Sequence, residues 1–90
     1  MEFSKALSPS EAKYKYLGLT KRAREEFPPK DQKFKLKFQN KIYNFNVNNK
    51  DCIMLSQLYQ VYQFVEGNTV KITKNKDGAF ELTVNSTGNM

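Results

Sequence analysis

The chain of 90 residues carries a formal net charge of +6 and contains no histidine and one cysteine. Ninety residues suffice for one domain with a modest hydrophobic core. A single cysteine excludes an internal disulfide, and the lack of histidine removes the usual general base and the commonest transition-metal ligand. The composition therefore argues against disulfide-stapled secreted proteins and against most metal-dependent or acid–base enzymes.

The positive charge is concentrated in the first half of the chain. Residues 1–50 contain 12 Lys and Arg against 5 Asp and Glu, whereas residues 51–90 contain 3 against 4. This imbalance favours an acidic partner, with nucleic acid first; a net charge that serves only solubility is the alternative. No apolar run or signal-peptide core is present, so we expect a soluble, cytoplasmic protein without a membrane partner. Abundant Lys and Asn favour a bacterial or phage origin.

Residues 1–30 are predicted to form a basic, mainly helical segment that packs on the rest of the domain. Ser8, Pro9 and Glu11 are typical of a helix start with a capping box, and Gly18 is a favoured stop, which predicts a helix over 9–17. Thr20 can cap a further helical turn that carries the densest cationic cluster, namely Lys21, Arg22 and Arg24. Its alternative is a solvated face neutralised by Glu25 and Glu26.

A hairpin over 33–47 is the strongest pattern in the chain. Both arms alternate apolar and polar residues with a period of two, which is typical of half-buried strands. A two-residue loop at Asn40 and Lys41 would place Phe38, Leu36 and Phe34 opposite Tyr43, Phe45 and Val47 on a buried face. The other face would carry Lys33, Lys35 and Lys37 opposite Asn44, Asn46 and Asn48.

The remaining elements are shorter. We expect a short buried strand over 52–54 and a brief helix over 57–64 capped by Ser56, with a strand as the alternative for that segment. A second hairpin over 69–85 turns at residues 75–78, and residues 86–90 form a frayed tail. The predicted core comprises Phe27, Phe34, Leu36, Phe38, Phe45, Leu58, Tyr62, Ile72, Phe80 and Leu82.

Together these elements predict an α+β, mostly β, fold. We expect a small, partly closed β-barrel or a curved antiparallel sheet of two hairpins (33–47 and 69–85), with an N-terminal helix (9–17) and a connecting helix (57–64). Residues 31–85 would form the β domain, with 1–30 packed on it and 86–90 as the tail.

No catalytic arrangement is apparent in the sequence. Cys52 follows Asp51, and a negative neighbour and burial both raise a thiol pKa, so we expect a core cysteine rather than a nucleophile. The Glu25–Glu26 pair lies in a charged surface stretch, and no metal-ligand spacing occurs. We therefore predict a protein that is not an enzyme and that uses no cofactor or metal.

The candidate site is a binding surface on the hairpin and the cationic cluster. Lysine supplies a point charge for phosphate and asparagine can hydrogen-bond bases or backbone, and a two-stranded ribbon fits the major groove of DNA. Exposed tyrosines, such as Tyr14 and Tyr16, could stack on bases, with a place at the edge of the core as their alternative. The predicted nucleic-acid-binding residues are Lys33, Lys35, Lys37, Lys41, Asn44, Asn46, Lys21, Arg22 and Arg24.

One motif carries a family resemblance. A short helix at Leu58-Tyr59 leads into Gly67-Asn68-Thr69-Val70, within a segment of strands from Phe34 to Val84. This arrangement resembles the cradle-loop or pseudobarrel DNA-binding domains, including AbrB-like regulators and the recognition domains of some restriction endonucleases. In those families a Gly-Asp-x-Val strand follows the helix, and Asn68 stands here where Asp is usual. The resemblance implies DNA binding through loops or a ribbon, as a monomer or a homodimer.

The function predicted from the sequence is non-enzymatic binding of nucleic acid, with duplex DNA favoured. The domain would be regulatory or the recognition module of a larger system. The alternative is a protein-interaction module, such as a phage or bacterial adaptor or inhibitor, that docks on an acidic protein surface.

Overall fold

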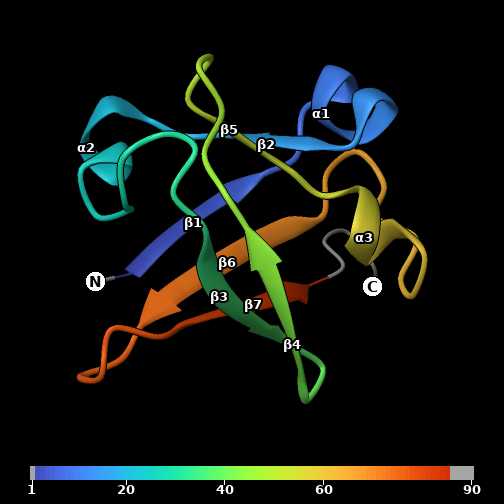
Figure 1. The fold of residues 1–90 in the computed structure, drawn as a ribbon. Coiled ribbons are helices and arrows are strands. Elements are labelled where there is room, and N and C mark those ends of the chain that lie inside the picture. The colour runs from blue at the N-terminus through green and yellow to red at the C-terminus, as the bar shows by residue number, and fades with distance from the viewer. Residues whose placement is uncertain (1, 86–90) are drawn as a thin grey trace.

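The computed structural model describes residues 2–85 (Figure 1). Within them, seven strands form two sheets, and three short helices lie between strands. The five-stranded sheet has the order β1-β6-β7-β3-β4, and β2 pairs with β5 in a second sheet. The elements are β1 (Glu2–Ala6), α1 (Pro9–Tyr14), β2 (Tyr16–Gly18), α2 (Lys21–Arg24), β3 (Phe34–Phe38), β4 (Lys41–Phe45), β5 (Cys52–Met54), α3 (Ser56–Tyr59), β6 (Thr69–Lys74) and β7 (Phe80–Asn85).

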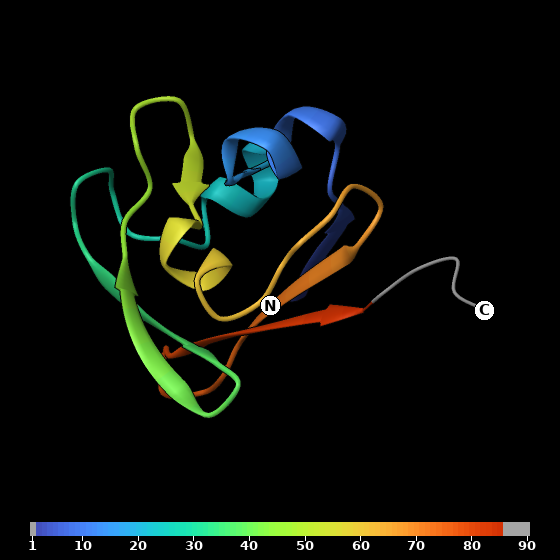
Figure 2. The same cartoon turned by 90° about the vertical axis from the view of Figure 1, so that its right-hand side faces the viewer.

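The fold class is the predicted α+β, mostly β, arrangement. Both predicted hairpins are present, as β3–β4 and β6–β7, and they are joined through a parallel pairing of β3 with β7. The large sheet is therefore mixed rather than wholly antiparallel, and it is not closed into a barrel. Figure 2 shows how the sheet curls, with α3 inside its concave side.

The β3–β4 hairpin has the predicted faces but a different register. Phe34 lies opposite Phe45 and Leu36 opposite Tyr43, which is a shift of two residues from the predicted pairing. The turn residues are Gln39 and Asn40, both with positive φ (51° and 66°), as a type I′ turn requires. A shift of two preserves which face each side chain occupies, so the rings still point inward.

The core confirms most of the residues chosen from the pattern. Of the ten predicted, nine are buried, and Tyr62 is partly buried against the cluster. Phe27 stacks on Phe80 with ring centroids 4.6 Å apart, and Phe34 meets Phe80 edge-on at 5.0 Å. This aromatic cluster anchors the end of the N-terminal segment to β3 and β7.

The N-terminal segment contains two strands that the sequence analysis missed. β1 pairs antiparallel with β6 and forms an edge of the large sheet, and β2 pairs with β5. The first helix ends at Tyr14, because Lys15 adopts a left-handed conformation with φ 62°, so the predicted helix over 9–17 is too long. Leu17 is fully buried on β2, so this segment contributes directly to the core.

Glu11 explains the geometry of this segment. Its buried carboxylate accepts hydrogen bonds from the backbone N–H of Ser8 (2.9 Å) and Gly18 (2.8 Å) and pairs with the Lys5 ammonium at 2.8 Å. The predicted capping box with Ser8 is confirmed. Gly18 lies in β2 and donates its N–H to Glu11, so it is not the helix stop that the sequence predicted.

The segment after β5 is less helical than predicted. α3 covers Ser56–Tyr59 instead of 57–64, and Ser56 lies inside the helix while Leu55 occupies the N-cap without a side-chain hydrogen bond. The predicted tail over residues 86–90 lies outside the described residues. Within residues 2–85, no helix combines the length and apolar character needed to cross a membrane.

Candidate nucleic-acid interface

The outer face of the β3–β4 hairpin carries most of the predicted lysines. Lys35 is exposed and lies directly opposite Asn44, which is also exposed. Lys33 precedes β3 and is exposed. Lys41 is also exposed, but it begins β4 directly opposite Phe38 and therefore lies on the other face of the hairpin, with its ammonium 5.6 Å from the centre of the Tyr43 ring. The inward aromatic residues fix the orientation of the outer face, because turning its lysines inward would expose Phe34, Leu36 and Phe38.

Lys37 is less available than its neighbours. It is half-buried and lies between Ile42 on β4 and Glu81 on β7. The Glu81 carboxylate reduces the positive potential at this point, and the exposed Ile42 interrupts the polar face. The outer cationic face of the hairpin is therefore strongest at Lys33 and Lys35.

A row of amides continues from this hairpin toward β5. The row comprises Asn44 and Asn46, followed by Asn48 in the loop between β4 and β5, and we call it the amide row. Its first members, with Asn48 and Met54, line a shallow hollow of ≈ 230 Å³. Gln57 closes the α3 side of this hollow by donating from Nε2 to the Asn44 carbonyl at 3.0 Å.

A larger hollow of ≈ 440 Å³ begins where the amide row ends, and we call it the loop hollow. It lies over the small β2–β5 sheet, between the β4–β5 loop and α1, near the top of Figure 1. The two hollows share Asn48 and Met54, so the surface is continuous from the hairpin to α1. The loop hollow is lined by Tyr14, Tyr16, Asn48, Asn49, Lys50, Cys52 and Met54.

The loop hollow combines exposed rings with cations. Tyr14 is 60% exposed, and the Lys13 ammonium lies 5.3 Å from the centre of its ring. Lys13, Lys15 and Lys50 are all exposed around this region. Such a combination of aromatic faces, amide groups and ammonium groups is typical of surfaces that contact nucleic acid.

The carboxylates near the loop hollow are already paired with cations. Glu11 and Asp51 are the acidic groups that act on Cys52, which lines the hollow. Glu11 pairs with Lys5, and Asp51 pairs with Arg24. At the Cys52 thiol the charges of Glu11 and Asp51 still act more strongly than those of Lys5 and Lys50, so the cations available to a ligand are the exposed lysines of this region, Lys13, Lys15 and Lys50.

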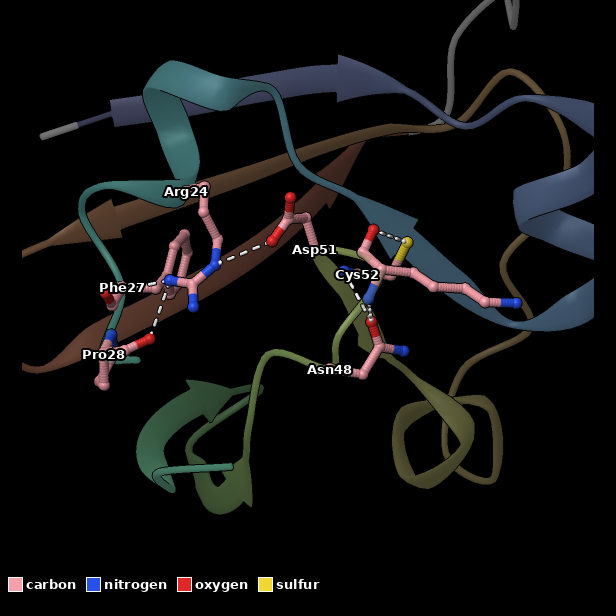
Figure 3. Close-up of polar contacts among 7 residues, drawn as sticks. Arg24, Phe27, Pro28, Asn48, Asp51 and Cys52 are labelled. Atoms are coloured by element: carbon pink, nitrogen blue, oxygen red, sulfur yellow. Dashed lines mark hydrogen bonds and ion pairs between the residues drawn. The ribbon is translucent and has the colours of Figure 1, made fainter. Parts of the chain in front are cut away.

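The loop between β4 and β5 is held by its own hydrogen bonds (Figure 3). Asn48 Oδ1 accepts from the backbone N–H of Lys50 at 2.9 Å and of Cys52 at 3.0 Å. The Asn48 N–H donates to the Cys52 carbonyl, and the Asp51 N–H donates to the Asn48 carbonyl. Asp51 itself adopts a left-handed conformation with φ 58°. These bonds define the shape of the loop that borders both hollows.

Arg24, which was predicted to reach a DNA groove, makes contacts within the domain. Its Nε donates to Asp51 Oδ1 at 3.2 Å, and its Nη1 donates to the carbonyls of Phe27 (3.3 Å) and Pro28 (2.8 Å) (Figure 3). The guanidinium thus ties α2 and the segment after it to the β4–β5 loop. This contact spans 27 residues of sequence, so local pattern could not reveal it.

The other two predicted cations of α2 lie away from the hairpin. Lys21 and Arg22 are exposed, and Arg22 lines a separate pocket with Glu2 and Phe3 of β1. β1 and β4 are opposite edges of the large sheet. The structure therefore does not gather the nine predicted residues into one patch, and Arg22 lies among acidic neighbours that include Glu26.

Cys52 is half-buried at the loop hollow rather than in the core as predicted. Its thiol donates to the Lys50 carbonyl at 3.4 Å. Burial, together with the negative charges of Glu11 and Asp51, raises the pKa of the Cys52 thiol. Among residues 2–85, no group of three or more acidic or cysteine side chains is placed to hold a metal ion.

Sequence analysis missed the role of the Lys13-Tyr14-Lys15-Tyr16 segment as a border of the hollow. The sequence predicts that this segment is part of the helix over 9–17. In the structure the helix ends at Tyr14, and the left-handed Lys15 turns the chain into β2. Local pattern gave no signal for this arrangement, because Tyr14 ends α1 and Tyr16 begins β2, on either side of the left-handed Lys15.

Comparisons with known proteins give similar folds but no sequence relatives. No protein-family model matches the chain, and no curated protein matches it in sequence. The hypothetical Arabidopsis thaliana protein At1g16640.1 is similar in structure, with a TM-score of 0.70 and 12% identity, over 100% of this chain and 94% of that one. The N-terminal domain of Helicobacter pylori LlaJI.R1 has a TM-score of 0.74 and 8% identity, over 100% of this chain and 91% of that one. At these identities the likeness shows the fold alone.

Proposed function

We propose that this domain binds duplex DNA and that it performs no catalysis. The observation that carries the proposal is the continuous surface from the lysines of the β3–β4 hairpin, along the amide row, to the loop hollow. Its exposed ammonium groups suit phosphates, and its amides suit base edges or the sugar–phosphate backbone. The resemblance of the Leu58–Val70 segment to DNA-binding domains supports the same conclusion.

One of the two similar folds adds support for this function. The N-terminal domain of Helicobacter pylori LlaJI.R1 shares this fold, which agrees with the resemblance to recognition domains of restriction endonucleases. We therefore propose that this domain serves as a recognition module, either in a larger restriction-type system or in a regulator. Within this proposal, Lys33, Lys35 and Lys50 contact phosphates, and Asn44 and Asn46 contribute polar contacts between them.

The salt dependence of binding tests the proposal. Labelled duplex DNA, single-stranded DNA and RNA are titrated with the purified chain at 50 and 200 mM salt. About three phosphate contacts predict a loss of roughly 40-fold in duplex affinity over this range. Duplex binding that is weak at 50 mM salt and equal to that of the other nucleic acids would contradict a duplex-specific function.

Two matched variants locate the surface. Lys35→Glu reverses a charge on the hairpin, and Lys76→Glu makes the same change in the exposed β6–β7 turn, far from the loop hollow in Figure 1. We expect a large loss of duplex affinity for Lys35→Glu and a small one for Lys76→Glu. Equal losses would indicate that only the net charge matters.

An acidic protein is the second candidate partner, because the same cationic surface complements it. Capture from nuclease-treated lysate distinguishes the two. A stoichiometric protein partner that survives moderate salt, together with no duplex binding by the purified chain, would replace DNA with this partner.

A further inference from the structure

Asn48 is a residue at which the two hollows meet, and its side chain is held by two hydrogen bonds from the loop backbone. It lines both the smaller hollow and the loop hollow. Two backbone N–H groups, those of Lys50 and Cys52, point at a single atom of its amide. Since both partners are donors, that atom must be the oxygen, so the orientation of the amide is determined.

The fixed oxygen leaves the amide nitrogen in a fixed place. An asparagine NH₂ group offers two donors, and within residues 2–85 no group accepts a hydrogen bond from Asn48 Nδ2. Figure 3 shows the oxygen of Asn48 turned toward the loop backbone and the nitrogen turned away from it. The group can donate but, with its oxygen engaged, it cannot turn over to accept without breaking both loop bonds.

The loop that holds Asn48 is braced from outside. The Leu19 N–H donates to the Asp51 carbonyl at 3.0 Å, and Arg24 holds the Asp51 carboxylate. Val47, just before Asn48, forms a bridge with Ile53, and both are fully buried. Asn48 is therefore positioned before a ligand arrives, so little conformational entropy opposes its use in binding.

We infer that Asn48 Nδ2 is a pre-oriented hydrogen-bond donor that selects an acceptor on bound nucleic acid. The inference rests on the proposed function and names a contact within it. A donor of fixed direction in a hollow that Lys50 also lines suits either a phosphate oxygen or an acceptor on a base edge, such as guanine O6 or a purine N7. Asn48 is thus distinct from Asn44, which is exposed on the hairpin and whose side chain forms no hydrogen bond within residues 2–85.

A matched pair of variants tests the inference. Asn48→Asp keeps an oxygen for the Lys50 and Cys52 N–H groups, so the loop retains its shape, while the donor is replaced by an acceptor. Asn49→Asp makes the same charge change at the next residue, which is exposed and forms no side-chain hydrogen bond within residues 2–85. Thermal unfolding of both variants establishes that each is folded.

The readout is duplex DNA affinity at one salt concentration. We expect Asn48→Asp to weaken binding about tenfold or more beyond Asn49→Asp, because a hydrogen bond to a charged or well-placed acceptor is lost and repulsion replaces it. Equal losses in the two variants, with wild-type binding intact, would overturn the role of Asn48 and leave the proposed function standing. No duplex binding by the wild-type chain would overturn both.

Selection from a randomised duplex library distinguishes the two sources of the acceptor. If Asn48 contacts a base edge, Asn48→Asp changes the preferred sequence at one position, while Asn49→Asp preserves it. If Asn48 contacts a phosphate, the preferred sequence stays the same and all sequences weaken alike. Either pattern, combined with the excess loss of affinity, supports the inference.

Discussion

Arg24 Nε and Asp51 Oδ1 lie 3.2 Å apart and join α2 to the loop that carries Asn48 and Lys50. The arginine side chain is 20% exposed, and its other donors reach the Phe27 and Pro28 carbonyls. Arg24, which was predicted from the sequence to contact DNA, thus positions a loop at the candidate interface. Its effect on binding is expected to act through the shape of the loop.

Asp51→Asn separates positioning from simple electrostatics. The change raises the net charge by one, so a purely electrostatic account predicts tighter DNA binding. Asparagine tolerates the left-handed conformation of residue 51, which isolates the loss of the carboxylate. We expect weaker duplex binding, by a few-fold, because the brace from Arg24 is lost; fluorescence anisotropy with labelled duplex measures it.

Asp77→Asn is the control for that variant. Asp77 is exposed in the β6–β7 turn, and its replacement makes the same charge change away from the loop hollow. We expect its duplex affinity to equal or slightly exceed that of the wild type. If Asp51→Asn also bound more tightly, Arg24 and Asp51 would have no positioning role.

The Glu11 carboxylate makes stability depend on pH. Burial by itself would raise its pKa, but hydrogen bonds from Lys5, Ser8 and Gly18 outweigh burial, and the pKa is lowered from 4.5. A lowered pKa in the folded state gives a stabilisation that is present above about pH 4.5 and is lost as pH falls through the folded value. The free energy of unfolding of the wild type should therefore fall between pH 5 and pH 3.

Glu11→Gln removes this contribution. Glutamine cannot accept from both N–H groups and pair with Lys5, so we expect about 1–3 kcal/mol of destabilisation at pH 7 and a smaller difference from the wild type at pH 3. Urea unfolding at both pH values measures it. Glu25→Gln, at an exposed position, should change little. A wild-type minus Glu11→Gln difference that stayed constant with pH would contradict the assignment.

The turn of the β3–β4 hairpin offers a test of its register. Gln39 and Asn40 both adopt left-handed conformations, and glutamine has no particular tolerance for one. Replacing them with Asn-Gly, the preferred type I′ pair, should raise the free energy of unfolding by about 1 kcal/mol. If the turn were at Asn40 and Lys41 instead, the same change would leave stability unchanged or lower it; thermal unfolding decides between them.

The features that depend on local sequence pattern were predictable, whereas those that depend on pairing between distant segments were not. The inward faces of both hairpins were predictable, because burial of Phe34, Leu36 and Phe38 depends only on a period of two. The register was not predictable, because a turn at Gln39-Asn40 and a turn at Asn40-Lys41 both satisfy the same alternation of apolar and polar residues. β1 was missed because Phe3 is its one large apolar side chain and its pairing with β6 crosses most of the chain.

The candidate site was predicted only in its hairpin half. Lys33, Lys35 and Asn44 are exposed on the expected face, whereas Lys41 lies opposite Phe38 on the other face. Arg24, in contrast, is used by Asp51, and Lys21 and Arg22 lie toward the opposite edge of the sheet, because tertiary contacts decide which cations remain available. The loop hollow could not be predicted at all, since it depends on how α1 and the β4–β5 loop flank the β2–β5 pair.

The measurement that tests the account most directly is the salt dependence of duplex affinity for the wild type and for the double variant Lys35→Gln and Lys50→Gln. If these two lysines contact phosphates at opposite ends of the surface, the slope of log affinity against log salt should become shallower by about 2, with weaker binding at low salt. The same slope and affinity in both proteins would contradict a DNA interface that runs from the hairpin to the loop hollow.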